Sequence, residues 1–148
     1  MTIASDCLNS RATMERTEFI DLGPVQAHVK CEEAFVPFLD AFPRVEPSKA
    51  SKPELSIALS LSQDGWEAQH RTFRRDSLFE IQTPFYRGTY DVQRGVARLE
   101  LAPPDIHLET HERRLYGALR ILLSIYLLEN GGAALHGCAM GASSRGHV

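Results

Sequence analysis

The longest stretch of helix-forming sequence, residues 106–129, limits most strongly what this chain can fold into. One stripe of apolar residues recurs there at the spacing of a helix face, namely Leu115, Leu119, Leu122, Ile125 and Tyr126. Further apolar residues fall elsewhere around the same helix, so we expect a long apolar helix that is covered on more than one side. The run Asn130-Gly131-Gly132 tolerates positive φ and should end it.

A short hairpin is predicted after the double glycine. Residues 133–140 are small and mostly apolar, as in a buried strand, and residues 141–146 are typical of a polar hairpin loop. Residues 147–148 would then open the return strand. Because strands usually run about five or six residues, two residues are too few to form one. We therefore expect this chain to be part of a longer protein.

The last third of the chain resembles a known family. Gly-Gly-Ala-Ala-Leu-His-Gly at 131–137, followed by Ser-Ser-Arg-Gly-His-Val at 143–148, is similar to the run-up to the phosphate loop of the HPr serine kinase/phosphorylase family. The resemblance implies a P-loop kinase domain akin to phosphoenolpyruvate carboxykinase. It implies phosphorylation of a hydroxyl group on a protein, a peptide or a small molecule, with ATP and magnesium.

His136 is the candidate catalytic residue that the resemblance implies. In that family the histidine of the His-Gly pair lies beside the phosphate loop, where an imidazole can orient or stabilise the transferring phosphate. The residues themselves leave an alternative open, a core histidine satisfied by a backbone carbonyl. Gly137 beside it would let the backbone come close to a strand or ligand, and structural need explains it equally well.

The phosphate loop itself has no counterpart in these residues. Such a loop needs glycines, a lysine that reaches the β and γ phosphates, and a serine or threonine for magnesium. The sequence holds no lysine after Lys52. We therefore expect no ATP hydrolysis by this chain and no cofactor bound to it, while ATP and magnesium remain implied for a full-length relative.

A metal site is a weaker alternative at the start of the long helix. His107 and His111 lie four residues apart, with Glu109 and Glu112 nearby, so both imidazoles could face one metal ion. The acid that zincin helices carry directly after the first histidine is missing. We favour a polar first turn, with Asp105 as its N-terminal cap.

The N-terminal two-thirds predict a β-rich module. Residues 1–17 are expected to be a flexible leader, residues 18–104 an antiparallel β-rich module, and residues 105–148 the long helix with the first strands of a kinase-like domain. Strands are predicted at 18–22, 25–31, 54–61, 66–76, 78–83, 85–92 and 96–101. Apolar residues alternate clearly at 54–61 and 78–83, whereas 66–76 is more polar. A short helix within 32–42 is interrupted by Pro37. The expected fold class is α+β: an antiparallel meander, a short N-terminal helix, and one long apolar helix leading into a C-terminal strand.

Composition excludes several partners. A net charge of −3 gives no field that attracts nucleic acid or an anionic membrane. The basic clusters at 71–75 and 113–114 are expected to be solvated faces.

Three cysteines far apart, Cys7, Cys31 and Cys138, suit a reducing cytoplasm. No apolar run is long enough to span a membrane, so we expect a cytoplasmic protein.

Two other functions compete with that of a kinase fragment. The module could bind a peptide or protein without catalysis, through a sheet edge or the concave face of the meander. It could instead be a structural subunit that oligomerises through the apolar helix, and we expect a homodimer.

Overall fold

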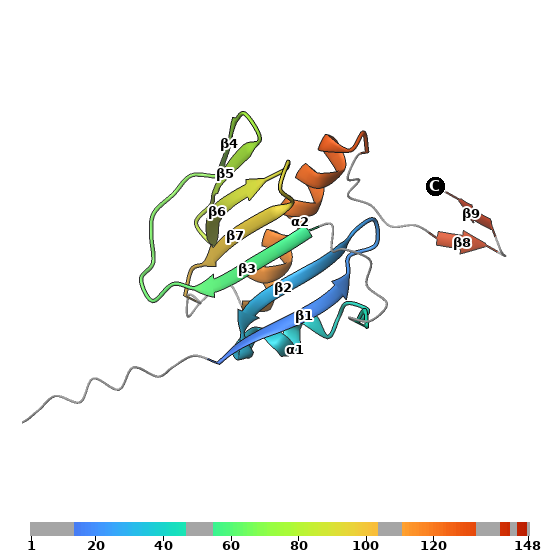
Figure 1. The fold of residues 1–148 in the computed structure, drawn as a ribbon, viewed down its shortest axis with the longest axis horizontal. Coiled ribbons are helices and arrows are strands. Elements are labelled where there is room, and N and C mark those ends of the chain that lie inside the picture. The colour runs from blue at the N-terminus through green and yellow to red at the C-terminus, as the bar shows by residue number, and fades with distance from the viewer. Residues whose placement is uncertain (1–13, 47–54, 104–110, 133–139, 143–144, 148) are drawn as a thin grey trace, which may run out of the picture.

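The computed structural model describes residues 14–46, 55–103, 111–132, 140–142 and 145–147 (Figure 1). It shows an α+β protein in which helices lie on one face of a seven-stranded sheet. The sheet comprises β1 (Glu15–Asp21), β2 (Gln26–Glu32), β3 (Leu55–Leu61), β4 (Arg71–Arg75), β5 (Leu78–Gln82), β6 (Tyr86–Asp91) and β7 (Val96–Leu101). The remaining elements are a 3-10 turn, η1 (Glu33–Phe35), the helices α1 (Val36–Leu39) and α2 (His111–Glu129), and a hairpin of β8 (Met140–Ala142) and β9 (Arg145–His147).

The directions of the strands differ from the prediction. The order across the sheet is β1-β2-β3-β7-β6-β5-β4. β3 lies between β2 and β7 and is parallel to both, whereas every other neighbouring pair in this sheet is antiparallel. The predicted antiparallel meander is therefore wrong for the sheet as a whole. Only the run from β4 to β7 has that form.

The connection after β2 explains why β3 is parallel to it. Parallel neighbours need a crossover that returns the chain to the end from which the first strand began. η1 and α1 lie within that crossover, between β2 and β3. Pro37 sits in the first turn of α1, where its missing N–H removes no helical hydrogen bond. The predicted interruption at Pro37 is therefore wrong: η1 gives way to α1 between Phe35 and Val36, and Pro37 lies within α1.

The hydrophobic core lies between the sheet and one face of α2. That face is Leu115, Ala118, Leu119, Leu122 and Ile125, all of them buried. Away from it, Arg120 is exposed and Leu128 is 66% exposed. The described residues therefore cover one face of α2 and not more than one as predicted, since the apolar residues beside the buried stripe are only partly buried.

A buried arginine fixes the N-terminal part of α2 to the end of β7. Arg114 is 4% exposed, and its guanidinium donates hydrogen bonds to the carbonyl oxygens of Ala102 and Pro103. The ring of Phe85 lies 5.7 Å from the guanidinium carbon. The expectation of a solvated basic pair therefore holds for exposed Arg113 and is wrong for Arg114.

The C-terminus of α2 is the glycine-capped end that the sequence predicts. Gly131 has a φ of 77°, and its N–H donates to the carbonyl of Leu128 at 3.4 Å. The N–H of Gly132 donates to the carbonyl of Leu127 at 2.7 Å, which completes a Schellman motif. A hairpin also forms near the end of the chain, but over other residues than predicted, because Gly141 and Gly146 pair inside β8 and β9 and not in the loop. Most of the predicted strand 133–140 lies outside the described residues.

Candidate binding surface on the sheet

The residues singled out for catalysis or metal binding fall largely outside the described part of the chain. His136, Gly137 and Cys138 lie outside it, as do Asp105 and His107. His111 is the first described residue of α2. Within the described ranges, no group of three or more His, Cys, Asp or Glu residues is placed to hold a metal ion. The described geometry therefore directs attention to the sheet.

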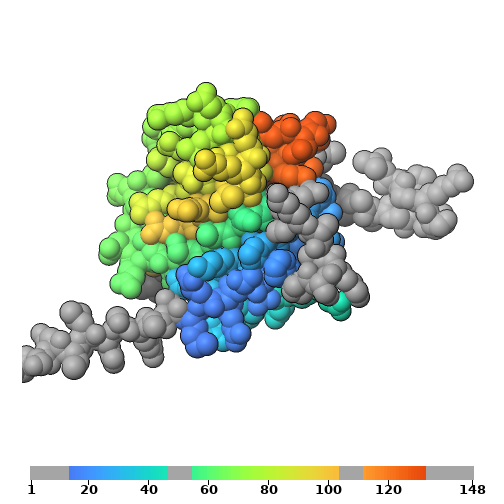
Figure 2. All heavy atoms as spheres, in the orientation of Figure 1, coloured from blue at the N-terminus to red at the C-terminus, as the bar shows by residue number. Residues whose placement is uncertain are grey.

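The face of the sheet opposite α2, here called the open face, is turned toward the viewer in Figure 2. A hollow on it, with a volume of about 560 Å³, is lined largely by polar residues. Residues from six strands contribute to its lining, among them Glu15, Lys30, Ser60, Glu80, Arg87 and Arg98. Strand alternation explains the polarity, because the apolar residues of the same strands turn into the core.

Charges on the open face are partly paired. Lys30 pairs with Glu15 at 2.6 Å, and Arg87 pairs with Glu100 at 2.8 Å. Arg87 also lies over the ring of Trp66, whose indole N–H donates to the carbonyl of Thr83 at 2.8 Å. These contacts fix one end of the open face, since Arg87 is held by a charge and a ring at once.

Two opposite charges in the middle of the open face do not meet. Thr89 of β6 stands between Arg98 of β7 and Glu80 of β5 in the strand register. Two strand spacings separate the backbones of Arg98 and Glu80 by about 9–10 Å. Neither residue forms an ion pair with another residue in the described ranges.

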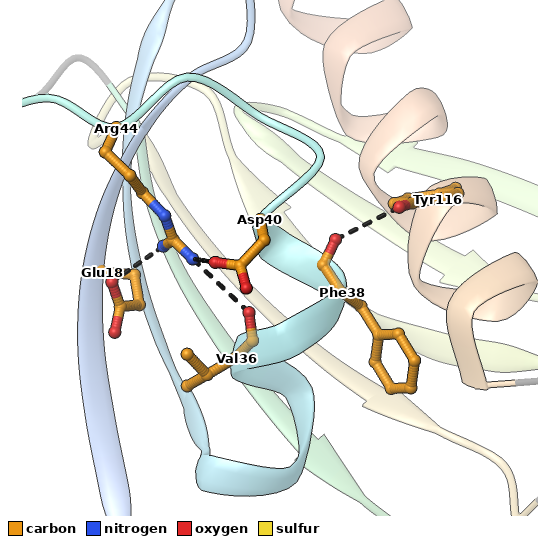
Figure 3. Close-up of polar contacts among 6 residues, drawn as sticks. All are labelled: Glu18, Val36, Phe38, Asp40, Arg44 and Tyr116. Carbon is orange, nitrogen blue, oxygen red and sulfur yellow. Dashed lines mark hydrogen bonds and ion pairs between the residues drawn. The ribbon is translucent and has the colours of Figure 1, made fainter.

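The β1 edge of the sheet is partly covered. Residues 43–45 run beside it, with the N–H of Asp21 donating to the carbonyl of Pro43 at 2.8 Å and that of Val45 to the carbonyl of Phe19 at 2.9 Å. Arg44 holds this segment in place (Figure 3). Its guanidinium contacts Glu18 on β1 at 2.7 Å and Asp40 after α1 at 2.5 Å.

The β4 edge has no such cover among the described residues. β4 pairs only with β5, and all five of its residues are exposed. Arg71, Phe73 and Arg75 alternate on the open-face side of the strand, and Phe73 is 48% exposed. A second hollow of about 480 Å³ adjoins Arg71. The edge therefore presents a basic strand with an apolar residue at its centre.

Hydrogen-bond direction shows which backbone groups of β4 point outward. The carbonyl of Ser77 accepts from Val92 at 2.9 Å, so Leu78 turns its polar groups toward Arg75. Alternation then directs the polar groups of Phe73 and Arg71 to β5. The N–H and C=O groups of Thr72 and Arg74 point away from the sheet.

One ion pair joins β4 to the end of α2. The guanidinium of Arg74 contacts the carboxylate of Glu129 through two hydrogen bonds, of 2.7 and 3.2 Å. The same guanidinium lies over the ring of Phe79 at 5.1 Å. β4 is therefore tied to the point where the chain leaves α2 for residues 130–132.

The buried titratable groups are unsuited to nucleophilic catalysis. Burial raises the pKa of the Cys31 thiol to about 11, with the charge of Glu18 adding to the shift. Burial likewise raises the pKa of the Tyr90 phenol to about 12. Both groups stay protonated at neutral pH, and Cys31 packs as a small apolar residue.

The sequence predicted the exposed basic strand of the β4 edge, but it did not predict that this strand lies at an edge of the sheet. The predicted strand 66–76 contains the basic cluster, which is confirmed as exposed. Its place at a sheet edge depends on the strand order, which alternation does not encode.

None of the described helices combines the length and apolar character needed to cross a membrane.

Comparison with protein-family models, with curated proteins and with solved structures found no match for this chain.

Proposed function

We propose that this chain is the substrate-recognition module of a phosphotransferase similar to the HPr serine kinase/phosphorylase family. In this proposal the sheet binds a segment of a protein or peptide, and a phosphate-loop kinase domain phosphorylates a hydroxyl group with ATP and magnesium. His136 is the proposed catalytic residue that this chain contributes. The chain alone is proposed to be inactive as a kinase, because it contains no lysine after Lys52.

The observation that carries the recognition half of the proposal is the uncovered β4 edge. An open strand edge captures an extended segment through main-chain hydrogen bonds, while side-chain positions on alternate faces select its sequence. The β1 edge, in contrast, is partly occupied by residues 43–45 of the same chain. The kinase half of the proposal is supported by the resemblance in residues 131–148 alone.

The coupling between the two halves is proposed to run through Arg74 and Glu129. A segment bound along β4 would lie beside the ion pair that fixes the end of α2. The chain continues from that end toward His136. Recognition and chemistry would therefore be close along the chain, as a kinase module requires.

Two measurements test the two halves separately. For the kinase half, the reading frame after the codon for Val148 should continue into a glycine-rich segment ending in Lys-Ser or Lys-Thr within about ten residues. A stop codon at that point would contradict it. For the recognition half, the purified chain should enrich extended segments from a random peptide display library without nucleotide. If nothing is enriched, the recognition half is wrong, and so is the alternative of a non-catalytic binding module.

A further inference from the structure

We infer that the β4 edge binds an acidic extended strand, with an apolar residue between two acidic ones at alternate positions. The inference rests on the proposed recognition function and specifies its partner. It follows from three properties of β4: free backbone groups, a basic side-chain row, and an apolar centre.

The backbone of β4 supplies the docking groups. Thr72 and Arg74 turn their N–H and C=O groups outward, with no pairing strand in the described ranges. An added strand would satisfy these groups and extend the sheet. The edge carries no proline, and no other described strand covers it, so its charged side chains are what limits the strands that can add to it.

The side chains of β4 determine the charge of the partner. Arg71 and Arg75 flank Phe73 on the open-face side, so an added strand would place its own residues opposite these three. Cross-strand pairs of opposite charge are stabilising, and an exposed aromatic ring favours an apolar neighbour. Arg74, on the other side, is already held by Glu129. The matching partner therefore has a pattern of five residues, with acidic residues at its first and fifth positions, an apolar residue at the third, and any residue at the second and fourth.

The same charges disfavour a second copy of β4, paired about Phe73, as the occupant. Two β4 strands paired antiparallel about Phe73 would place Arg71 of one directly opposite Arg75 of the other. Like charges directly opposite each other destabilise a strand pair. The arginines thus disfavour self-association through β4 and favour the binding of an acidic segment.

The binding experiment uses the full 148-residue chain and a synthetic peptide of about seven residues, Thr-Glu-Thr-Val-Thr-Glu-Thr, which carries the inferred pattern on one face of an extended strand. Fluorescence anisotropy should show binding that weakens as salt is raised, because exposed ion pairs are screened. A peptide with lysine in place of glutamate should not bind. Equal binding of both peptides would overturn the acidic selectivity.

Backbone pairing is tested on the peptide, which avoids any effect on folding of the chain. N-methyl groups are placed on the two glutamates and the valine in one peptide and on the threonines between them in another. Only one set of N–H groups can face β4, so one methylated peptide should lose binding and the other should keep it. If both peptides bind as well as the parent, strand addition is wrong.

Variants of the chain locate the site. Arg71→Ala with Arg75→Ala should weaken acidic-peptide binding by about fivefold, the magnitude expected for two exposed ion pairs. Arg94→Ala with Arg120→Ala makes the same charge change elsewhere and should leave binding unchanged. Thr72→Pro should weaken binding about tenfold through the loss of an outward N–H, whereas Thr17→Pro on the β1 edge should not. Equal effects in the matched variants would overturn the assignment to β4.

The results separate this inference from the proposed function. If the peptide display library enriches segments that are not acidic, recognition stands and the inference fails. If the acidic peptide binds but the reading frame stops after Val148, the inference stands and the kinase half fails.

Discussion

At the scale of one residue, the basic side chain of Arg114 has a structural role, because it joins α2 to the end of β7. Its guanidinium is enclosed between the end of β7 and α2, where water cannot replace the carbonyls of Ala102 and Pro103. The cost of burying the charge is offset by these hydrogen bonds and by the ring of Phe85. Its neighbour Arg113, one position around the helix, is exposed.

Replacing this arginine should destabilise the fold. Arg114→Leu removes the donor from the carbonyl oxygens of buried Ala102 and partly buried Pro103, so we expect the free energy of unfolding to fall by about 1–3 kcal/mol. Urea denaturation followed by circular dichroism measures it. Arg120→Leu, on the exposed side of the same helix, serves as the control and should change stability by less than about 0.5 kcal/mol. Equal losses in both variants would contradict a structural role for Arg114.

Burial of Tyr90 makes the free energy of unfolding depend on pH in the alkaline range. Its pKa is raised to about 12, chiefly by burial and further by Tyr126 and Glu129, against about 10 in an unfolded chain. Folding therefore favours the neutral phenol, and this contribution is complete below about pH 10 and lost as pH rises toward 12. In Tyr90→Phe the fall in unfolding free energy across that window should be shallower by up to about 1.4 kcal/mol per pH unit. An unchanged slope would contradict the assignment.

At the scale of elements, β6 and β7 approach each other closely at one glycine. A Cβ atom built on Gly88 would lie 1.9 Å from the carbonyl oxygen of Arg98, which belongs to the backbone and cannot turn aside. Nothing lies within 4 Å of the corresponding position at Gly65. The pairing of the two strands therefore depends on the absence of a side chain at Gly88.

The matched pair of alanine variants tests this close approach. Gly88→Ala must move β6 from β7 and should lower the free energy of unfolding by about 2–4 kcal/mol, in the range of an overpacked core. Gly65→Ala should leave it within about 0.5 kcal/mol of the parent. Thermal melts of both proteins give the comparison. Similar melting temperatures would show that β6 relaxes without cost.

Elements were also the scale at which the sequence was most informative. Alternating residues such as Leu55, Ile57 and Leu59 predicted β3 and its buried face, and the double glycine predicted the end of α2. Alternation does not encode strand direction, so β3 was wrongly placed in an antiparallel meander. The number of apolar residues around α2 likewise led us to expect more of the helix surface to be buried than is buried. A count of apolar residues cannot show that Leu128 is exposed.

The candidate surface could be predicted only in part for the same reason. The cluster around Phe73 was predicted to be a solvated basic face, and exposure is confirmed. Whether that strand has one partner or two depends on contacts far apart in sequence. The other candidate, His136, lies outside the described residues, so its role stays a prediction.

At the scale of the whole molecule, recognition and chemistry are assigned to different parts of the chain. In the proposed function the β4 edge receives the partner, whereas the resemblance to a phosphotransferase family is carried by residues 131–148, and the sequence has no lysine after Lys52 for a phosphate loop. Purified, this chain should therefore show no ATP hydrolysis in a coupled-enzyme assay. Turnover that disappears in His136→Ala would contradict this division of roles.

The most direct test of the account is residue-resolved amide hydrogen exchange by NMR, without and with the acidic peptide. In the free chain the amides of Thr72 and Arg74 should exchange rapidly, while those of Asp21 and Val45 should be protected by their hydrogen bonds. The peptide should protect Thr72 and Arg74 and leave the β1 edge unchanged. Protection of these two amides in the free chain, or no change on adding a peptide that binds, would contradict recognition at the β4 edge.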